Sequence, residues 1–202
     1  MRYLITHSLL SSWSWAMRDN PYEDLTTERD KTEEFLKSLN REPIERTPAM
    51  QNGIDFEDLV TDIMFELGDK THKWYDAALR VHDIVRKGSL LQYSAKQEIT
   101  IAGKDLLLYG RLDALRAGVV YDIKFSGSYD RGIYINSTQH PMYLELIPKA
   151  KKFVYVISNG REVWTETYTR EDTPSILPII EDFLAWLKTH ELMGLYQEKW
   201  QA

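Results

Sequence analysis

The sequence predicts a mixed α/β protein in which a central mixed β-sheet is flanked by helices. Apolar residues recur at the helical spacing of about 3.6 residues in segments 54–67 and 176–187. Runs rich in β-branched and aromatic residues predict strands at 92–101, 106–125, 153–157 and 162–169. Because helical and strand patterns interleave along one chain, we expect a single sheet covered by helices.

Length and composition agree with one domain. The chain has 202 residues, of which 43% are hydrophobic and 28% charged, values ordinary for a globular protein with its own core. We expect a helical N-terminal extension (1–50), a core (53–170) and a C-terminal helix (174–190). The sequence has no run of about eighteen apolar residues and no basic–apolar leader, so we expect no membrane partner and a cytoplasmic location.

Cysteine usage and charge restrict the chemistry. The chain has no cysteine, which excludes disulfides, thiolate metal sites and cysteine nucleophiles. Any metal must be held by carboxylate, imidazole or carbonyl groups, which favours a hard cation such as Mg²⁺ or Mn²⁺. The net charge of −6 argues against a broadly basic surface, but it allows a local basic site or one in which metal ions supply positive charge.

Helices are expected before the first long strand, at 3–18, about 26–40, 53–68 and 71–86. Thr6 is a candidate N-cap of the first helix, and Thr26 or Thr27 of the second. The third helix has an apolar stripe and is expected to carry Glu57 in its first turn. The fourth is expected to end at Lys87-Gly88.

The second half of the chain contains two clear turn or cap signals. Thr138 is a candidate cap for a helix over residues 139–147. Asn159-Gly160 predicts a two-residue turn between two strands. The last helix is expected to have Pro174 in its first turn and to end near Leu187.

The stretch 109–124 is the most informative part of the sequence. It predicts two strands joined by a tight turn at Gly118. If the hairpin closes symmetrically, Asp113 faces Asp122, and two like charges so placed repel unless a cation lies between them. Lys124 lies on the same face as Asp122, because strand side chains alternate. A solvent-facing Asp-x-Lys is also typical of a hydrated strand, so this motif alone leaves its role open.

The order of the motifs resembles the PD-(D/E)xK nuclease superfamily, in its RecB-like and phage (lambda-type) exonuclease branch. The matching segments are Gly53-Ile-Asp-Phe-Glu57, Gly110-Arg-Leu-Asp113, Asp122-Ile-Lys124 and Gln139-His-Pro-Met-Tyr143. Some relatives have His where Glu57 stands. Others carry an iron–sulfur cluster, which this chain, without cysteine, has no ligands to bind.

The resemblance implies a restriction-endonuclease-like core and a metal-dependent nuclease acting on DNA, most closely an exonuclease of phage recombination or repair. Mg²⁺, with Mn²⁺ as a substitute, would be held by Glu57, Asp113, Asp122 and the backbone carbonyl of Ile123. An RNA-cleaving nuclease and an inactive nuclease-like module that binds nucleic acid or protein are the alternatives.

The remaining motif residues have supporting roles under the same resemblance. Lys124 would hold or help to deprotonate the attacking water. Gln139 and Tyr143 would position Lys124 or the scissile phosphate.

Four further residues are candidate nucleic-acid contacts: Arg111, Ser126, Arg131 and Lys149. Arg111 shares the face of Asp113, and Ser126 and Arg131 lie in the loop just after the acidic motif. Arg111 could equally form a surface salt bridge, and Lys149 could equally be a solvated surface lysine without a nucleic-acid contact. The expected partners are DNA and a single-strand annealing or recombination protein, in a bacterial or phage-infected cell, and a homo-oligomer is left open.

Overall fold

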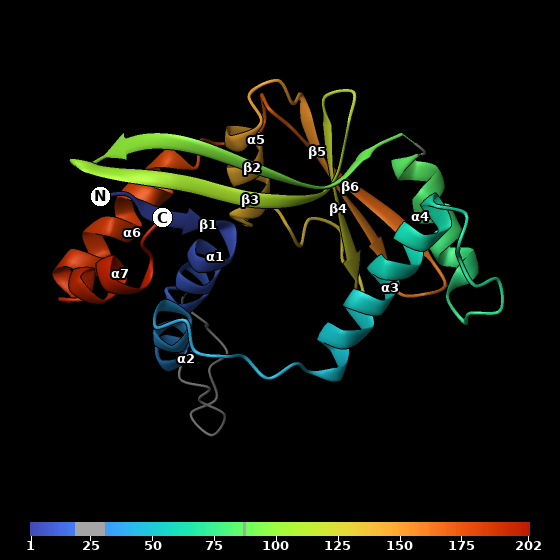
Figure 1. Cartoon of the computed structure of the whole chain (residues 1–202), viewed down its shortest axis with the longest axis horizontal. Coiled ribbons are helices and arrows are strands. Elements are labelled where there is room, and N and C mark those ends of the chain that lie inside the picture. The colour runs from blue at the N-terminus through green and yellow to red at the C-terminus, as the bar shows by residue number, and fades with distance from the viewer. Residues whose placement is uncertain (19–30, 87) are drawn as a thin grey trace.

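The computed structural model describes residues 1–18, 31–86 and 88–202. A six-stranded mixed sheet with helices packed on it confirms the predicted mixed α/β class (Figure 1). The elements are β1 (Tyr3–Thr6), α1 (His7–Ala16), α2 (Lys31–Leu39), α3 (Pro48–Met64), α4 (Tyr75–Val85), β2 (Leu90–Ile101), β3 (Lys104–Arg116), β4 (Val119–Phe125), α5 (Gln139–Leu146), β5 (Lys152–Ser158), β6 (Val163–Thr169), α6 (Leu177–Thr189) and α7 (Met193–Lys199).

Strand β3 organises the sheet, whose order is β1-β3-β4-β5-β6, with β2 pairing to β3 outside this path. β2 runs antiparallel along nearly the whole of β3. The other edge of β3 is shared, because β1 pairs in parallel with Leu106–Tyr109 and β4 pairs antiparallel with Ala114–Arg116. Residues 110–113 therefore lie in an interval between two partner strands.

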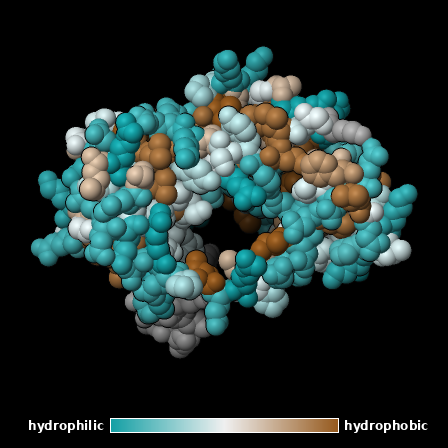
Figure 2. All heavy atoms as spheres, viewed as in Figure 1, coloured by the Kyte–Doolittle hydropathy of each residue, from teal (hydrophilic) through white to brown (hydrophobic). Residues whose placement is uncertain are grey.

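The helices divide between two hydrophobic cores. The larger core joins α1, α2, α5, α6 and α7 to the sheet, and the smaller one joins α3 and α4 to it. In Figure 1, α1, α2, α6 and α7 gather toward one end of the long β2–β3 ribbon, α5 lies near its middle, and α3 and α4 lie at the other end. Figure 2 shows a hollow in the middle of this face, in the region that Figure 1 places between the ribbon, α1 and α3.

Alternate side chains of β3 change from one core to the other at a single residue pair of the β2–β3 ribbon. Leu112 belongs to the larger core and Ala114 to the smaller one, although alternate residues of a regular strand point to the same face. Between them, the Gln92–Asp113 pair is absent from an otherwise continuous ladder, and Gln92 has a φ of 49°. The β2–β3 ladder is thus interrupted at Asp113 of the acidic motif.

The N-terminal segment differs from the expected helical extension. Thr6 is confirmed as the N-cap of α1, since its hydroxyl accepts a hydrogen bond from the Leu9 amide at 3.2 Å. Residues 3–6, however, form β1, because parallel pairing with β3 gives their backbone groups partners in the sheet. The proposed caps Thr26 and Thr27, and Lys87 at the end of α4, lie outside the described residues.

Helix α3 starts earlier than the expected start at Gly53. The Thr47 hydroxyl accepts a hydrogen bond from the Met50 amide at 3.2 Å, and Pro48 occupies the first turn. Glu57 consequently lies in the middle of α3, and its predicted place in the first turn is wrong. The next helix begins at Tyr75 rather than near Thr71.

The C-terminal half shows two further corrections. The last residue pair of β5 and β6 is Ser158–Val163, so residues 159–162 form the connection instead of the expected two-residue turn. The Asn159 carboxamide oxygen shapes this loop by accepting hydrogen bonds from two backbone amides. Helix α6 begins at Leu177 with Pro178 in its first turn, and α7, which follows it, was not predicted. No helix in the described parts of the chain is long and apolar enough to cross a bilayer.

Candidate active site

The predicted hairpin register is confirmed. Ala114 pairs with Tyr121 and Leu115 with Val120, and the turn between the strands has positive φ at Gly118 (78°). Beyond the Ala114–Tyr121 pair the two strands separate, β3 staying with β2 and β4 with β5. Asp113 and Asp122 are next in register, so they stand on the two sides of this opening.

The Asp113 carboxylate bridges the opening between the strands. Its Oδ2 accepts a hydrogen bond from the backbone amide of Ile123 at 2.7 Å. Burial raises the pKa of Asp113 well above its usual range, and the nearby charges of Asp122 and Glu57 raise it further. Ionising Asp113 in the folded protein is therefore unfavourable unless positive charge is brought close to it.

Asp122 is buried between Gln139 and Lys124. The Gln139 side-chain amide donates a hydrogen bond to Oδ1. The Lys124 ammonium lies 2.8 Å from Oδ2 and forms an ion pair with it. No other partner of Oδ2 is found among the described residues, and a carboxylate oxygen can accept from more than one group, so Oδ2 can still face another electropositive group.

Lys124 remains a cation. Its side chain is 32% exposed. Burial by itself would lower the pKa of the ammonium, but the Asp122 carboxylate outweighs burial, and the pKa lies above its usual value. The charged amine can hold a water or a phosphate oxygen. As long as it stays paired with Asp122, however, it is a poor proton acceptor at neutral pH.

Glu57 reaches this cluster from α3. The Gln92 side-chain amide donates a hydrogen bond to its Oε1. Burial raises the pKa of Glu57, the hydrogen bond from Gln92 opposes that shift, and the Asp122 charge raises the pKa further. The structure thus brings Glu57, Asp113, Asp122 and Lys124 into one electrostatically coupled group.

Helix α5 brings both of its motif residues to the site. Gln139 contacts Asp122, and the Tyr143 hydroxyl donates to the backbone carbonyl of Arg111 at 2.9 Å. Gln139 thus orients a carboxylate that pairs with Lys124, and Tyr143 ties α5 to β3 two residues before Asp113.

The close packing of Tyr143 explains the glycine in the Gly110-Arg-Leu-Asp113 motif. A Cβ atom at Gly110 would lie 2.2 Å from Tyr143 Cε1 and 2.8 Å from Leu146 Cδ1. We predict that Gly110→Ala lowers the free energy of unfolding by about 1–3 kcal/mol through overpacking. Chemical denaturation measures this change.

Gly53→Ala is the matched control for Gly110→Ala. No atom lies within 4 Å of a Cβ at Gly53, which is inside α3, so alanine there is expected to stabilise the helix by about 0.5–1 kcal/mol. Equal effects of the two substitutions on stability would show that the Tyr143 contact does not require glycine.

The four candidate nucleic-acid contacts are not all near the carboxylates. Arg111 is exposed on β3, and the Ser126 hydroxyl donates to the Ser128 carbonyl at 2.7 Å, just beyond β4. Arg131 is exposed in the loop that follows. Lys149 lies beside the hairpin turn, with its carbonyl 3.4 Å from where a Gly118 Cβ would be. At roughly 3.3 Å per strand residue, that turn is about 13 Å along β4 from Asp122.

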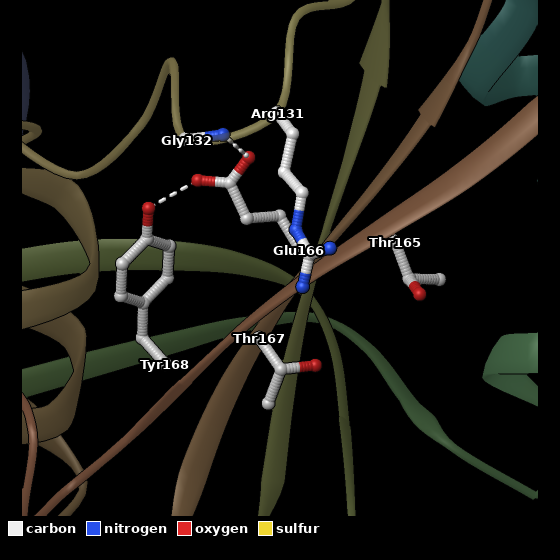
Figure 3. Close-up of a pocket in the computed structure, with 6 residues that line it drawn as sticks. All are labelled: Arg131, Gly132, Thr165, Glu166, Thr167 and Tyr168. Carbon is white, nitrogen blue, oxygen red and sulfur yellow. Dashed lines mark hydrogen bonds between the residues drawn. The ribbon is translucent and has the colours of Figure 1, made fainter.

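A buried carboxylate from the edge strand β6 anchors the loop that carries Arg131. Glu166 accepts hydrogen bonds from Tyr129 Oη at 2.7 Å, from the Gly132 amide at 3.0 Å and from the Tyr168 hydroxyl. Figure 3 shows Glu166 between Gly132 and Tyr168, in a cavity of about 310 Å³ that Arg131 also lines. Burial would raise the pKa of Glu166, but the hydroxyl donors outweigh it and the pKa is lowered.

Removing this anchor should release the loop. We predict that Glu166→Ala increases hydrogen exchange at the Gly132 amide and costs about 1–3 kcal/mol of unfolding free energy, because the three donors lose their charged acceptor. Thr167→Ala, at the next, exposed position of β6, is the control and should leave exchange unchanged. Unchanged exchange in both variants would mean that Glu166 does not hold the loop.

Sequence reasoning missed two polar residues at this site, Gln92 and His7. His7 opens α1 with its ring centroid 6.1 Å from that of Tyr143, and its Nδ1 is buried without a hydrogen-bond partner among the described residues. Burial lowers the pKa of His7 to about 3, and the Lys124 charge contributes. Neither residue stands out in the sequence, since Gln92 fits an ordinary alternating strand and His7 an ordinary helix start.

The donor set suits a hard divalent cation. The described residues contain no group of three or more His, Asp or Glu side chains already gathered in metal-binding geometry. Even so, Glu57, Asp113 and Asp122 offer only oxygen ligands. Burial raises the pKa values of Asp113 and Glu57, and neighbouring negative charge raises them further. Asp122 Oδ2 is buried with Lys124 as its partner. A divalent cation would relieve this repulsion and compete with Lys124 for Asp122.

Comparison with known proteins bears on the fold. No protein-family model and no curated protein matches the sequence. Among solved structures, the chain is similar to one described as "Crystal structure of SSO0001", with a TM-score of 0.55 and 17% sequence identity, over 92% of this chain and 77% of that one. At this identity the similarity shows the fold alone, and it extends the mixed α/β assignment over nearly the whole chain.

Proposed function

We propose that the protein is a metal-dependent nuclease that hydrolyses DNA phosphodiester bonds, acting as an exonuclease in recombination or repair. The observation that carries this proposal is the placement of Asp113 and Asp122 on either side of the opening between β3 and β4, with Glu57 and Lys124 coupled to them. Oxygen ligands for a hard cation, with a cationic amine beside them, are a combination that metal-assisted phosphodiester hydrolysis can use.

In the proposed reaction, Mg²⁺, or Mn²⁺ in its place, would be held by Glu57, Asp113, Asp122 and the Ile123 carbonyl. When bound, the metal lowers the pKa of water and offsets charge on the phosphate. Lys124, charged and beside Asp122, holds the attacking water or a phosphate oxygen through its ammonium donors.

The supporting residues keep the carboxylates in place. Gln139 fixes the Asp122 carboxylate through Oδ1 and leaves Oδ2 directed elsewhere. Tyr143 fixes the β3 backbone beside Gly110, which limits movement of Asp113. Such preorganisation lowers the reorganisation needed at the moment of reaction.

The nucleic acid is proposed to enter the hollow seen in Figure 2. Arg111 on β3, together with Ser126 and Arg131 in the loop after β4, would contact its phosphates. Lys149 would contact only a more distant part of the strand. A single-strand annealing or recombination protein in a bacterial or phage-infected cell is the proposed partner.

A direct cleavage assay tests the proposal. The purified protein is incubated with Mg²⁺ or with EDTA on linear and circular DNA, single- and double-stranded, and on RNA. The proposal expects Mg²⁺-dependent loss of linear DNA, with circular DNA spared. Cleavage of RNA alone would reassign the substrate, and cutting of circles would indicate an endonuclease.

The ion pair between Lys124 and Asp122 favours one other candidate, an inactive module that binds nucleic acid or protein. In such a module Lys124 would permanently neutralise Asp122. Calorimetric titration with Mg²⁺ separates the two functions, because the inactive module would bind no Mg²⁺ through its carboxylates and would leave every nucleic acid intact.

A further inference from the structure

Gln92 has an unusual backbone conformation for its place in the fold. Its φ is 49°, in the left-handed region that non-glycine residues seldom adopt. The other non-glycine residues with positive φ lie in turns or just after helices: Arg41, Glu66, Arg86, Ala102, Ala117 and Glu191. Gln92 instead lies within strand β2. The left-handed conformation costs free energy there, and contacts with the surrounding residues must offset that cost.

The conformation of Gln92 has two structural consequences at the site. It removes the Gln92–Asp113 pair from the ladder, at the point where alternate side chains of β3 change from one core to the other. It also directs the side chain of Gln92 toward α3, where the amide donates a hydrogen bond to Glu57 Oε1. A regular strand would have paired Gln92 with Asp113 instead.

We infer that Gln92 is a positioning residue that orients the Glu57 carboxylate for a shared divalent cation, and that it thereby sets the metal affinity of the site. This inference rests on the proposed function. The amide has no charge and occupies one oxygen of Glu57, so the second oxygen is left to bind a cation. Such partners of ligating carboxylates raise metal affinity by fixing ligand orientation.

The competing explanation is purely structural. The Gln92–Glu57 hydrogen bond joins β2 to α3 and could serve only to attach the smaller core to the sheet. A structural tie changes stability when it is removed, whereas a positioning residue changes metal affinity. The two roles therefore differ in what a substitution at Gln92 affects.

Gln92→Gly separates these roles because it removes the amide and relieves the backbone strain at once. We expect the variant to stay folded, with a thermal midpoint within about 5 °C of wild type. Its affinity for Mn²⁺, measured by calorimetry without nucleic acid, should fall about 10- to 100-fold. In cleavage assays the Mg²⁺ concentration needed for half-maximal rate should rise similarly.

Two companion variants control for the backbone. Ala102→Gly relieves a φ of 50° in the β2–β3 turn, away from the carboxylates, and should leave Mn²⁺ affinity unchanged. Gln92→Asn keeps a residue that tolerates the left-handed region but shortens the side chain, so it should lose affinity as Gln92→Gly does.

The outcomes distinguish this inference from the proposed function. Mn²⁺ affinities of Gln92→Gly or Gln92→Asn within twofold of wild type overturn the positioning role, as does an equal loss in Ala102→Gly. In that case a wild type that binds Mn²⁺ and cleaves DNA leaves the proposed function standing. A wild type that neither binds Mn²⁺ nor cleaves DNA overturns both.

Discussion

Asp122→Asn is expected to abolish Mg²⁺-dependent DNA cleavage while leaving the fold intact. Asparagine has nearly the same volume as aspartate, and its oxygen can still accept the hydrogen bond from Gln139. It lacks the charge that pairs with Lys124 and that would hold a divalent cation. Losing several kcal/mol of charge stabilisation corresponds to a rate decrease of about 10³-fold or more, which a single-turnover cleavage assay measures.

The control for this prediction is Asp105→Asn. Asp105 lies on β3, like Asp113, but is exposed, and its carboxylate accepts a hydrogen bond from the Thr100 hydroxyl at 3.0 Å. Its replacement should change neither cleavage nor stability by a measurable amount. A rate for Asp122→Asn within tenfold of wild type would remove Asp122 from the reaction.

Asp113→Asn is expected to make the metal-free protein more stable and, at the same time, inactive. In the folded protein, burial and the charges of Asp122 and Glu57 raise the pKa of Asp113. Each unit by which the pKa is raised destabilises the folded state at neutral pH by about 1.4 kcal/mol relative to a neutral side chain. Asparagine removes this penalty and can still accept the hydrogen bond from the Ile123 amide.

The pH dependence of this effect has a definite sign. Below the usual pKa of an aspartate, both folded and unfolded states hold the proton, so wild type and Asp113→Asn should have similar stability. As pH rises toward the raised pKa of the folded state, the unfolded wild type releases its proton first and wild type loses stability. The advantage of the variant should therefore be absent near pH 3 and full above that raised pKa.

Thermal melts across this pH range, with and without Mg²⁺, measure both effects. Mg²⁺ should raise the midpoint of wild type more than that of the variant, because only wild type has the Asp113 carboxylate. An Asp113→Asn protein that is less stable than wild type at neutral pH would contradict the electrostatic account of the cluster.

The parts of the site that were predicted correctly depend on local structure. Gly118 and the strand-forming residues on either side of it set the hairpin register, and that register makes Asp113 and Asp122 the next residues in line where the two strands separate. Thr6 was recognised as a cap because a cap interacts with the first turn of its own helix. These interactions join residues that are close in sequence.

The features that were missed depend on distant parts of the chain. The strand β1 is short, and it forms because its backbone pairs in parallel with β3, about a hundred residues later in the chain. The left-handed conformation of Gln92 occurs where its pair with Asp113, 21 residues later, is missing from the ladder, and its contact with Glu57 joins β2 to α3. Neither leaves a pattern in the local sequence, so each required the structure.

The most direct test of the central claim is a crystal structure grown with Mn²⁺, in which anomalous scattering locates the metal. The account predicts a peak between β3 and β4, with oxygens of Asp113 and Asp122 both about 2.0–2.4 Å from the ion. Lys124 should then have moved away from Asp122 Oδ2. An anomalous map without a peak at this position, or with Mn²⁺ bound to only one of the two aspartates, would contradict the claim that Asp113 and Asp122 share one cation.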